Sequence, residues 1–153
     1  MEEIPVVTIR GGKIRRENKI WKKKERVELM EELIEKYGMV YVVDTDGKKG
    51  LPNLKLYKSI GKNIWADTFP RDLNDIFDLL VCGVEKITIH DIDEKYLGEI
   101  KNTIENEIFI FDDIEKAKKY KFAGVVTEKD LNCNCELQIW KLSGDFIRRV
   151  NNG

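Results

Sequence analysis

The sequence predicts an α/β fold in which about six parallel strands alternate with helices, followed by a C-terminal β-hairpin. Short apolar runs rich in β-branched residues recur along the chain, and longer segments of helical apolar spacing separate them. Neighbouring parallel strands need a long crossover, which these helical segments supply. We expect one domain of 153 residues, with the repeats over residues 1–131 and the hairpin tail over residues 132–153.

The first half of the chain holds three expected strands and two expected helices. Apolar residues recur three or four positions apart before Gly38, a residue that suits the end of a helix. The apolar run after Gly38 is too short for a helix and predicts a buried strand. In chain order the elements are the strand Ile4–Ile9, the helix Lys24–Tyr37, the strand Met39–Val43, the helix Asn53–Ile60 and the strand Asn63–Ala66.

The second half repeats the same alternation. Asp72 opens its first helix and Gly83 ends it. The expected elements are the helix Asp72–Val81, the strand Val84–Ile89, the helix Asp93–Asn102, the strand Glu107–Phe111, the helix Asp113–Tyr120 and the strand Ala123–Thr127. Two further strands, Leu137–Leu142 and Phe146–Val150, flank Ser143-Gly144-Asp145, which predicts a hairpin.

The charge balance bears on possible partners. The formal net charge is -1, which disfavours nucleic acid as a partner unless basic residues gather on one face. The segment Lys13–Arg26 is such a candidate. The alternative is a solvated loop leading into the exposed face of a helix, because Glu28, Glu31 and Glu32 follow at once and can pair with it at helical spacing.

No apolar run approaches the ~20 residues that span a bilayer, and the N-terminus lacks the apolar core of a signal peptide. We therefore expect a cytoplasmic protein without membrane contact. Its three cysteines do not predict a disulfide framework. Cys133 and Cys135 are separated by one residue, which disfavours zinc and leaves either a redox-sensitive pair or no role. Abundant Lys and Glu are typical of thermophilic proteins.

Three stretches share their order and spacing with one known family. They are the strand and Gly-Lys turn of Ile4–Lys13, the acidic strand end Val42–Gly47 with the Asn-Leu that follows it, and the helix, turn and strand of Ala66–Ile89. Together they resemble the HisA/HisF-type phosphoribosyl isomerases of histidine biosynthesis, and Ile108–Lys129 is similar to a late unit of those (βα) barrels. The resemblance implies a truncated TIM-barrel-like fold, because a full barrel takes ~250 residues and this chain is about two units short.

The chain departs from this family where the family does its chemistry. Thr8 stands where the family has a catalytic aspartate, and a hydroxyl cannot shuttle a proton in the same way. Asp67, Phe69 and Pro70 replace a phosphate-binding glycine run, and Asp112 lies where a second glycine pair is expected. The resemblance therefore implies that the ancestral isomerisation is lost.

The candidate site residues come from the carboxyl ends of the expected strands, which gather on one face of a parallel sheet. As catalytic residues we expect Asp44, Asp46 and His90, and as ligand-binding residues Arg10, Asp67, Arg71, Asp112 and Lys129. The carboxylates could instead bind a divalent cation, or cap the helices that follow, as suits Asp67, Asp72, Asp93 and Asp113. We expect neither a metal site nor a cofactor.

His90 is the only histidine, so it can act either as an acid–base group or as a structural side chain. The function expected from these observations is binding of a small phosphorylated metabolite or a partner chain without turnover. A sugar-phosphate isomerase or lyase that uses the strand-end carboxylates is the alternative. Because a sheet lacking two units has open edges, we also expect a homo-oligomer such as a homodimer.

Overall fold

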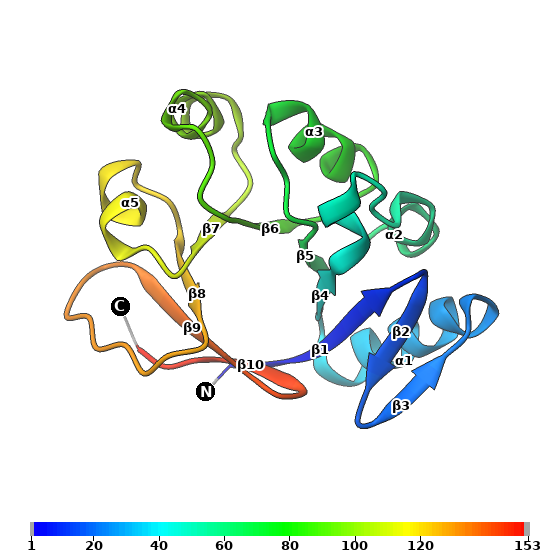
Figure 1. Cartoon of the computed structure of the whole chain (residues 1–153). Coiled ribbons are helices and arrows are strands. Elements are labelled where there is room, and N and C mark those ends of the chain that lie inside the picture. Colours follow the sequence, from blue (N-terminus) through cyan, green and yellow to red (C-terminus); the bar gives the residue numbers. More distant parts are fainter. Residues whose placement is uncertain (1, 152–153) are drawn as a thin grey trace.

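The computed structural model describes residues 2–151, which form one ten-stranded sheet with helices along the outer side of most of its strands (Figure 1). The strands are β1 (Glu3–Arg10), β2 (Lys13–Arg16), β3 (Lys19–Trp21), β4 (Val40–Asp44), β5 (Ile64–Asp67), β6 (Lys86–Ile89), β7 (Ile108–Phe111), β8 (Gly124–Thr127), β9 (Gln138–Ser143) and β10 (Phe146–Arg149). The α-helices are α1 (Arg26–Tyr37), α2 (Leu54–Ile60), α3 (Leu73–Val81), α4 (Glu94–Thr103) and α5 (Ile114–Lys119), and the 3-10 helices are η1 (Lys23–Glu25) and η2 (Thr45–Lys49). Every helix in this part of the chain is too short or too polar to traverse a bilayer.

Eight of the strands close into a barrel, while β2 and β3 extend the sheet beside β1. The pairings from β1–β4 through β8–β9 are parallel. β10 is antiparallel to both β9 and β1, so that Ile4 faces Ile147 across the closing seam. Viewed along its axis, the barrel forms a ring of strands with the helices outside it (Figure 1).

The expected truncated TIM-barrel-like sheet of about six parallel strands with a separate hairpin tail is therefore wrong, as is the HisA/HisF-like architecture that went with it. The structure is a closed, mixed barrel. The hairpin does form, but its strands complete the ring instead of standing apart. An antiparallel strand needs only a tight turn, which lies here around Gly144 with a φ of 62°. The last strand of the barrel is therefore added without a long crossover connection.

Two apolar layers hold the barrel. Inside it, large side chains from alternating strand positions fill the interior, and among them Trp65 packs edge-on against both Tyr41 and Trp140. Thr88 lies fully buried in this layer and accepts hydrogen bonds from the Tyr41 hydroxyl and the Trp65 indole, each at 3.0 Å. The outer layer lies between the strands and the helices, where the opposite faces of the strands meet α1 to α5.

The basic segment Lys13–Arg26 differs from both sequence interpretations, because residues 13–21 form the β2–β3 hairpin. Its turn residues Glu17 and Asn18 both have positive φ, at 52° and 61°, as a two-residue hairpin turn requires. Arg16 is buried and donates to the carbonyl of Val6 at 3.1 Å. The hairpin is thereby fixed over the barrel wall.

Candidate functional site

The carboxyl ends of β5 and β6 bring an acid and an imidazole into contact. Asp67 is the last residue of β5 and His90 follows the last residue of β6. His90 Nε2 lies 2.7 Å from Asp67 Oδ2. The Asp67 side chain is 4% exposed and the His90 side chain is 28% exposed. The carboxylate is therefore buried, whereas the imidazole is partly accessible to solvent.

The hydrogen bonds of Asp67 assign the proton on His90. An ionised carboxylate only accepts hydrogen bonds, and Asp67 Oδ1 also accepts one from the backbone N–H of Phe69 at 3.0 Å. Nε2 of the neutral imidazole is therefore the protonated nitrogen, and Nδ1 carries the lone pair. Within residues 2–151 no protein group hydrogen-bonds to Nδ1, which leaves this atom free to accept a hydrogen bond from a ligand or, when it is protonated, to donate one.

Two phenyl rings flank the imidazole. The Phe69 ring stacks on His90 with centroids 4.5 Å apart, and the Phe111 ring lies 4.9 Å away. Lys48 Nζ lies 4.5 Å from the centroid of Phe69. We call Lys48, Asp67, Phe69, His90 and Phe111 the mouth cluster, because its last four members come from the ends of the adjacent barrel strands β5, β6 and β7.

The backbone around the mouth cluster is strained at two positions. Phe69 and Asp112 have φ values of 55° and 54°, a left-handed conformation that costs non-glycine residues about 1–3 kcal/mol. The Phe69 N–H donates to Asp67, and the Asp112 N–H donates to the carbonyl of Val126 at 2.8 Å. These two N–H groups already satisfy protein acceptors, so neither is available to bind a phosphate.

Asp44 and Asp46, expected to be catalytic, are part of a network that holds β1, η2 and α2 together. Asp44 is fully buried and accepts from the Tyr57 hydroxyl and from the backbone and side-chain nitrogens of Asn53, at 2.8 and 3.0 Å for the latter two. Burial raises the pKa of Asp44, although these hydrogen bonds oppose the rise. The carboxylate is surrounded by protein donors and does not meet His90.

Asp46 fixes the turn between β1 and β2. Its carboxylate accepts from the N–H groups of Gly11 and Gly12 at 2.7 and 2.9 Å. Both glycines have positive φ, which this tight turn requires. Burial alone would raise the pKa of Asp46, but hydrogen bonds from Asn53 and both glycines, with the charge of Lys49, lower it. Asp46 therefore stays ionised as a structural acceptor.

The expected ligand-binding residues separate into two groups. Asp67 belongs to the mouth cluster. Asp112 lies beside it, where Lys129 Nζ approaches at 3.0 Å and the Thr127 hydroxyl donates at 3.0 Å. The bond from Lys129 lowers the pKa of Asp112. Arg71 is instead bound to Asp75 at 3.2 Å on α3, and Arg10 is exposed at the end of β1.

Helix capping accounts for three of the four acids assigned to it by sequence. Asp72, Asp93 and Asp113 accept from the backbone N–H groups of Asp75, Lys95 and Lys116 at the starts of α3, α4 and α5. The fourth, Asp67, binds His90 instead. Among residues 2–151 no three His, Cys, Asp or Glu side chains come together in a way that could hold a metal ion.

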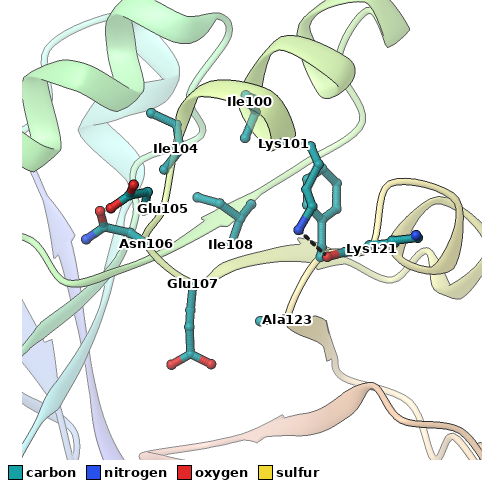
Figure 2. A pocket seen from close by; sticks show the side chains of 10 residues that line it. Ile100, Lys101, Ile104, Glu105, Asn106, Glu107, Ile108, Lys121 and Ala123 are labelled. Atoms are coloured by element: carbon teal, nitrogen blue, oxygen red, sulfur yellow. Dashed lines mark hydrogen bonds between the residues drawn. The ribbon is translucent and has the colours of Figure 1, made fainter.

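A cavity of about 200 Å³ lies at the opposite end of the barrel, near the starts of β7 and β8. Figure 2 shows Ile100, Ile104 and Ile108 gathered between α4 and β7. At its rim Lys101 Nζ donates to the carbonyl of Lys121 at 3.0 Å (Figure 2). Asn106 Nδ2 donates to the carbonyl of Glu85 at 3.1 Å. With these polar groups already paired, the cavity offers weaker recognition chemistry than the mouth cluster.

Sequence reasoning missed the aromatic half of the mouth cluster. Phe69 was interpreted only as an obstacle to phosphate, and Phe111 and Lys48 were not assigned a role. One signal was available: Phe111 ends its strand as Asp67 ends β5, and His90 comes directly after β6. Side chains at equivalent strand ends of a parallel sheet are neighbours in space.

Comparison with known proteins leaves the chain without an assigned relative. No protein-family model matches it, and no curated protein matches it either. Kinship with the phosphoribosyl isomerases stays a prediction from the sequence.

Proposed function

We propose that this chain binds a small phosphorylated metabolite at the mouth cluster and does not isomerise it. The observation that carries the proposal is the contact between His90 and Asp67. A nearly buried carboxylate orients the imidazole by one nitrogen, while the other nitrogen remains free for a ligand. When this ring is protonated at Nδ1, that nitrogen donates to an anionic oxygen of the ligand.

The charges nearby support an anionic ligand. Lys48 brings a cation to the Phe69 ring, and residues 2–151 offer its ammonium no carboxylate within salt-bridge distance. His90 and Lys48 can therefore both face the phosphate, which side chains would hold in place of the backbone N–H groups. The phenyl rings of Phe69 and Phe111 supply apolar walls for the rest of the ligand.

We expect no turnover because the other candidate acids, Asp44 and Asp46, serve as structural hydrogen-bond acceptors. Isomerisation of an aminoaldose phosphate needs a second acid or base opposite the first. Asp44 is enclosed by protein donors, Asp46 is held by the N–H groups of Gly11 and Gly12, and Thr8 cannot serve. The mouth cluster keeps one oriented imidazole, which is enough to bind a ligand.

Thermal unfolding with ribose 5-phosphate tests the proposal. Ligand that binds only the folded state raises Tm as its concentration passes the Kd. We expect millimolar ribose 5-phosphate to raise the Tm of the wild type and of Lys101→Met, a control at the opposite end of the barrel. We expect ribose to have no effect, and His90→Gln to lose the response. An unchanged wild-type Tm, or an equal rise in His90→Gln, would contradict the proposal.

A sugar-phosphate isomerase or lyase is the second candidate function, and the same dyad favours it. An Asp-oriented histidine has the geometry of a general base, with Nδ1 as the atom that would take a proton. In D₂O, a base that abstracts the proton beside the carbonyl of ribose 5-phosphate would exchange it for deuterium. Proton NMR of that position decides: deuterium incorporation that needs His90 supports the enzyme, and its absence supports binding alone.

The cytoplasmic location and the homodimer expected from the sequence belong to this proposal as well. Closure of the barrel removes the open edges that motivated the dimer, but β3 remains an edge strand, with Ile20 exposed. Light scattering after size exclusion tests the dimer, which we expect to pair through β3. A monomer at every concentration would contradict it.

A further inference from the structure

The segment between β8 and β9 differs from every earlier connection between neighbouring parallel strands. From β1 to β8 each such connection contains an α-helix, whereas residues 128–137 contain none and join two parallel strands. Within this segment Cys133 and Cys135 form a disulfide. Both cysteines are half-buried and pack against the outer apolar layer, where a helix would otherwise lie.

This disulfide is poorly placed to stabilise the fold. It joins residues two positions apart. The restraint that a disulfide imposes on the unfolded chain grows with the length of the loop it closes, so a loop this short restrains little. A bridge that adds little stability needs a different explanation from a structural one.

The surroundings of the bridge favour reaction with an external thiol. Asn132, Asn134 and Glu136 alternate with the half-buried cysteines and are exposed, so solvent reaches the segment that carries the bridge. The third cysteine, Cys82, is buried at the end of α3, and burial raises the pKa of its thiol. Because the thiolate is the attacking species in disulfide exchange, Cys82 does not compete for either sulfur.

We propose that Cys133 and Cys135 are a thiol–disulfide redox centre whose co-reactant is a thiol. In the reducing direction, a thiolate of the co-reactant attacks one Sγ, forms a mixed disulfide and releases the other cysteine as a thiolate that takes a proton from water. A second thiolate of the co-reactant then attacks the co-reactant's sulfur in the mixed disulfide. This step releases the remaining cysteine as a thiolate. Two electrons pass to the protein pair, and the co-reactant leaves as its disulfide.

Equilibration in glutathione redox buffers tests this centre in the unmodified chain. After acid quenching, alkylation and trypsin, the peptide from Asp130 to Lys141 carries both cysteines, and the peptide from Asp72 to Lys86 carries Cys82. We expect the first peptide to change from no alkyl groups to two as reduced glutathione replaces oxidised glutathione. We expect the second peptide to carry one alkyl group in every buffer, because Cys82 is a free thiol.

Thermal unfolding of the two redox forms separates a redox centre from a structural bridge. Because the closed loop is short, we expect reduction to lower Tm by no more than about 5 °C. The Cys133→Ser/Cys135→Ser variant should match the reduced protein in Tm and show no transition. A bridge that resists every glutathione buffer, cysteines that stay free in oxidised glutathione, or a larger fall in Tm on reduction would overturn the proposal. The test is independent of whether the mouth cluster binds phosphate.

Discussion

His90 Nε2 and Asp67 Oδ2 lie 2.7 Å apart although the two residues are 23 positions apart in the sequence. The barrel creates this contact by placing the ends of β5 and β6 side by side. Because the chain has one histidine, the signals of this imidazole can be assigned without ambiguity. The candidate site therefore contains its own spectroscopic probe.

Replacing Asp67 should allow the neutral His90 ring to adopt either tautomer. Asp67→Asn can present either an oxygen or an NH₂ group to Nε2, so the neutral imidazole is no longer held as the Nε2–H form. We expect the ¹⁵N shifts of the two ring nitrogens to move toward each other relative to wild type. Asp75→Asn, on α3, is the control and should leave both shifts in place. Unchanged shifts in Asp67→Asn would mean that the aspartate does not orient the ring.

Thr88 should be sensitive to loss of its hydroxyl. Thr88→Val leaves the buried Tyr41 hydroxyl and Trp65 indole without an acceptor, and each unsatisfied donor costs about 1–3 kcal/mol. We expect chemical denaturation to give a free energy of unfolding lower by about 2–6 kcal/mol. Thr88→Ser keeps the oxygen and should lose much less. Equal losses in the two variants would show that packing of the methyl group matters instead.

The hydrogen bond from Tyr57 to Asp44 should contribute measurably to stability. Tyr57→Phe keeps the ring and removes one donor to a buried carboxylate, a loss of about 1.5–3 kcal/mol in the free energy of unfolding. Tyr37→Phe, on the half-buried face of α1, is a matched control and should change stability little. Urea denaturation checks both variants. A Tyr57→Phe protein as stable as wild type would remove the energetic role given to this network.

Asp44 should also give the stability a pH dependence of known sign. Its pKa is raised by burial in the folded state above the ordinary 3.8, so the folded protein binds the proton more tightly than the unfolded chain. The resulting contribution of Asp44 to stability is fully present below pH 3.8. It is lost as the pH rises through the raised pKa of the folded state. The stability of wild type minus that of Asp44→Asn should therefore fall as pH rises through this window. A difference that rises with pH would contradict the buried carboxylate.

The ion pair between Asp112 and Lys129 should give the stability a pH dependence of opposite sign and smaller magnitude. The hydrogen bond from Lys129 lowers the pKa of Asp112, so its contribution is present above the ordinary carboxyl pKa and lost as pH falls through the lowered value. Lys129 is largely exposed, which limits the contribution to under about 1 kcal/mol. Lys129→Met should differ from wild type at neutral pH and match it in acid. A gap that widens in acid would exclude this ion pair as its source.

Local signals in the sequence predicted most helices and strands but not the closure of the strands into a barrel. Apolar spacing and Gly38 located α1, and Asp72 was correctly expected to cap α3. The pairing of β10 with β1 joins residues near opposite ends of the chain, and no local pattern reports such a contact. The β2–β3 hairpin was missed because its turn uses Glu17 and Asn18, where glycine is the usual signal.

The site could be predicted by position but not by role. Strand ends drew attention to Asp67 and His90, which the structure brings into contact, since parallel strands gather their carboxyl ends. The same rule gave equal weight to Asp44 and Asp46. The donors that enclose Asp44, the side chains of Asn53 and Tyr57, lie 9 and 13 residues away, and their contacts depend on the packing of α2 against the barrel. Side-chain partners of this kind are fixed by tertiary packing.

The ¹⁵N spectrum of the His90 ring in the wild-type protein, recorded at a pH where the imidazole is neutral, tests the mouth cluster most directly. In the free protein we predict a protonated Nε2 and an unprotonated Nδ1. Addition of ribose 5-phosphate, but not of ribose, should shift the Nδ1 resonance towards that of a protonated nitrogen. A neutral ring protonated at Nδ1, or an Nδ1 resonance that ribose 5-phosphate leaves unmoved, would contradict the binding site described above.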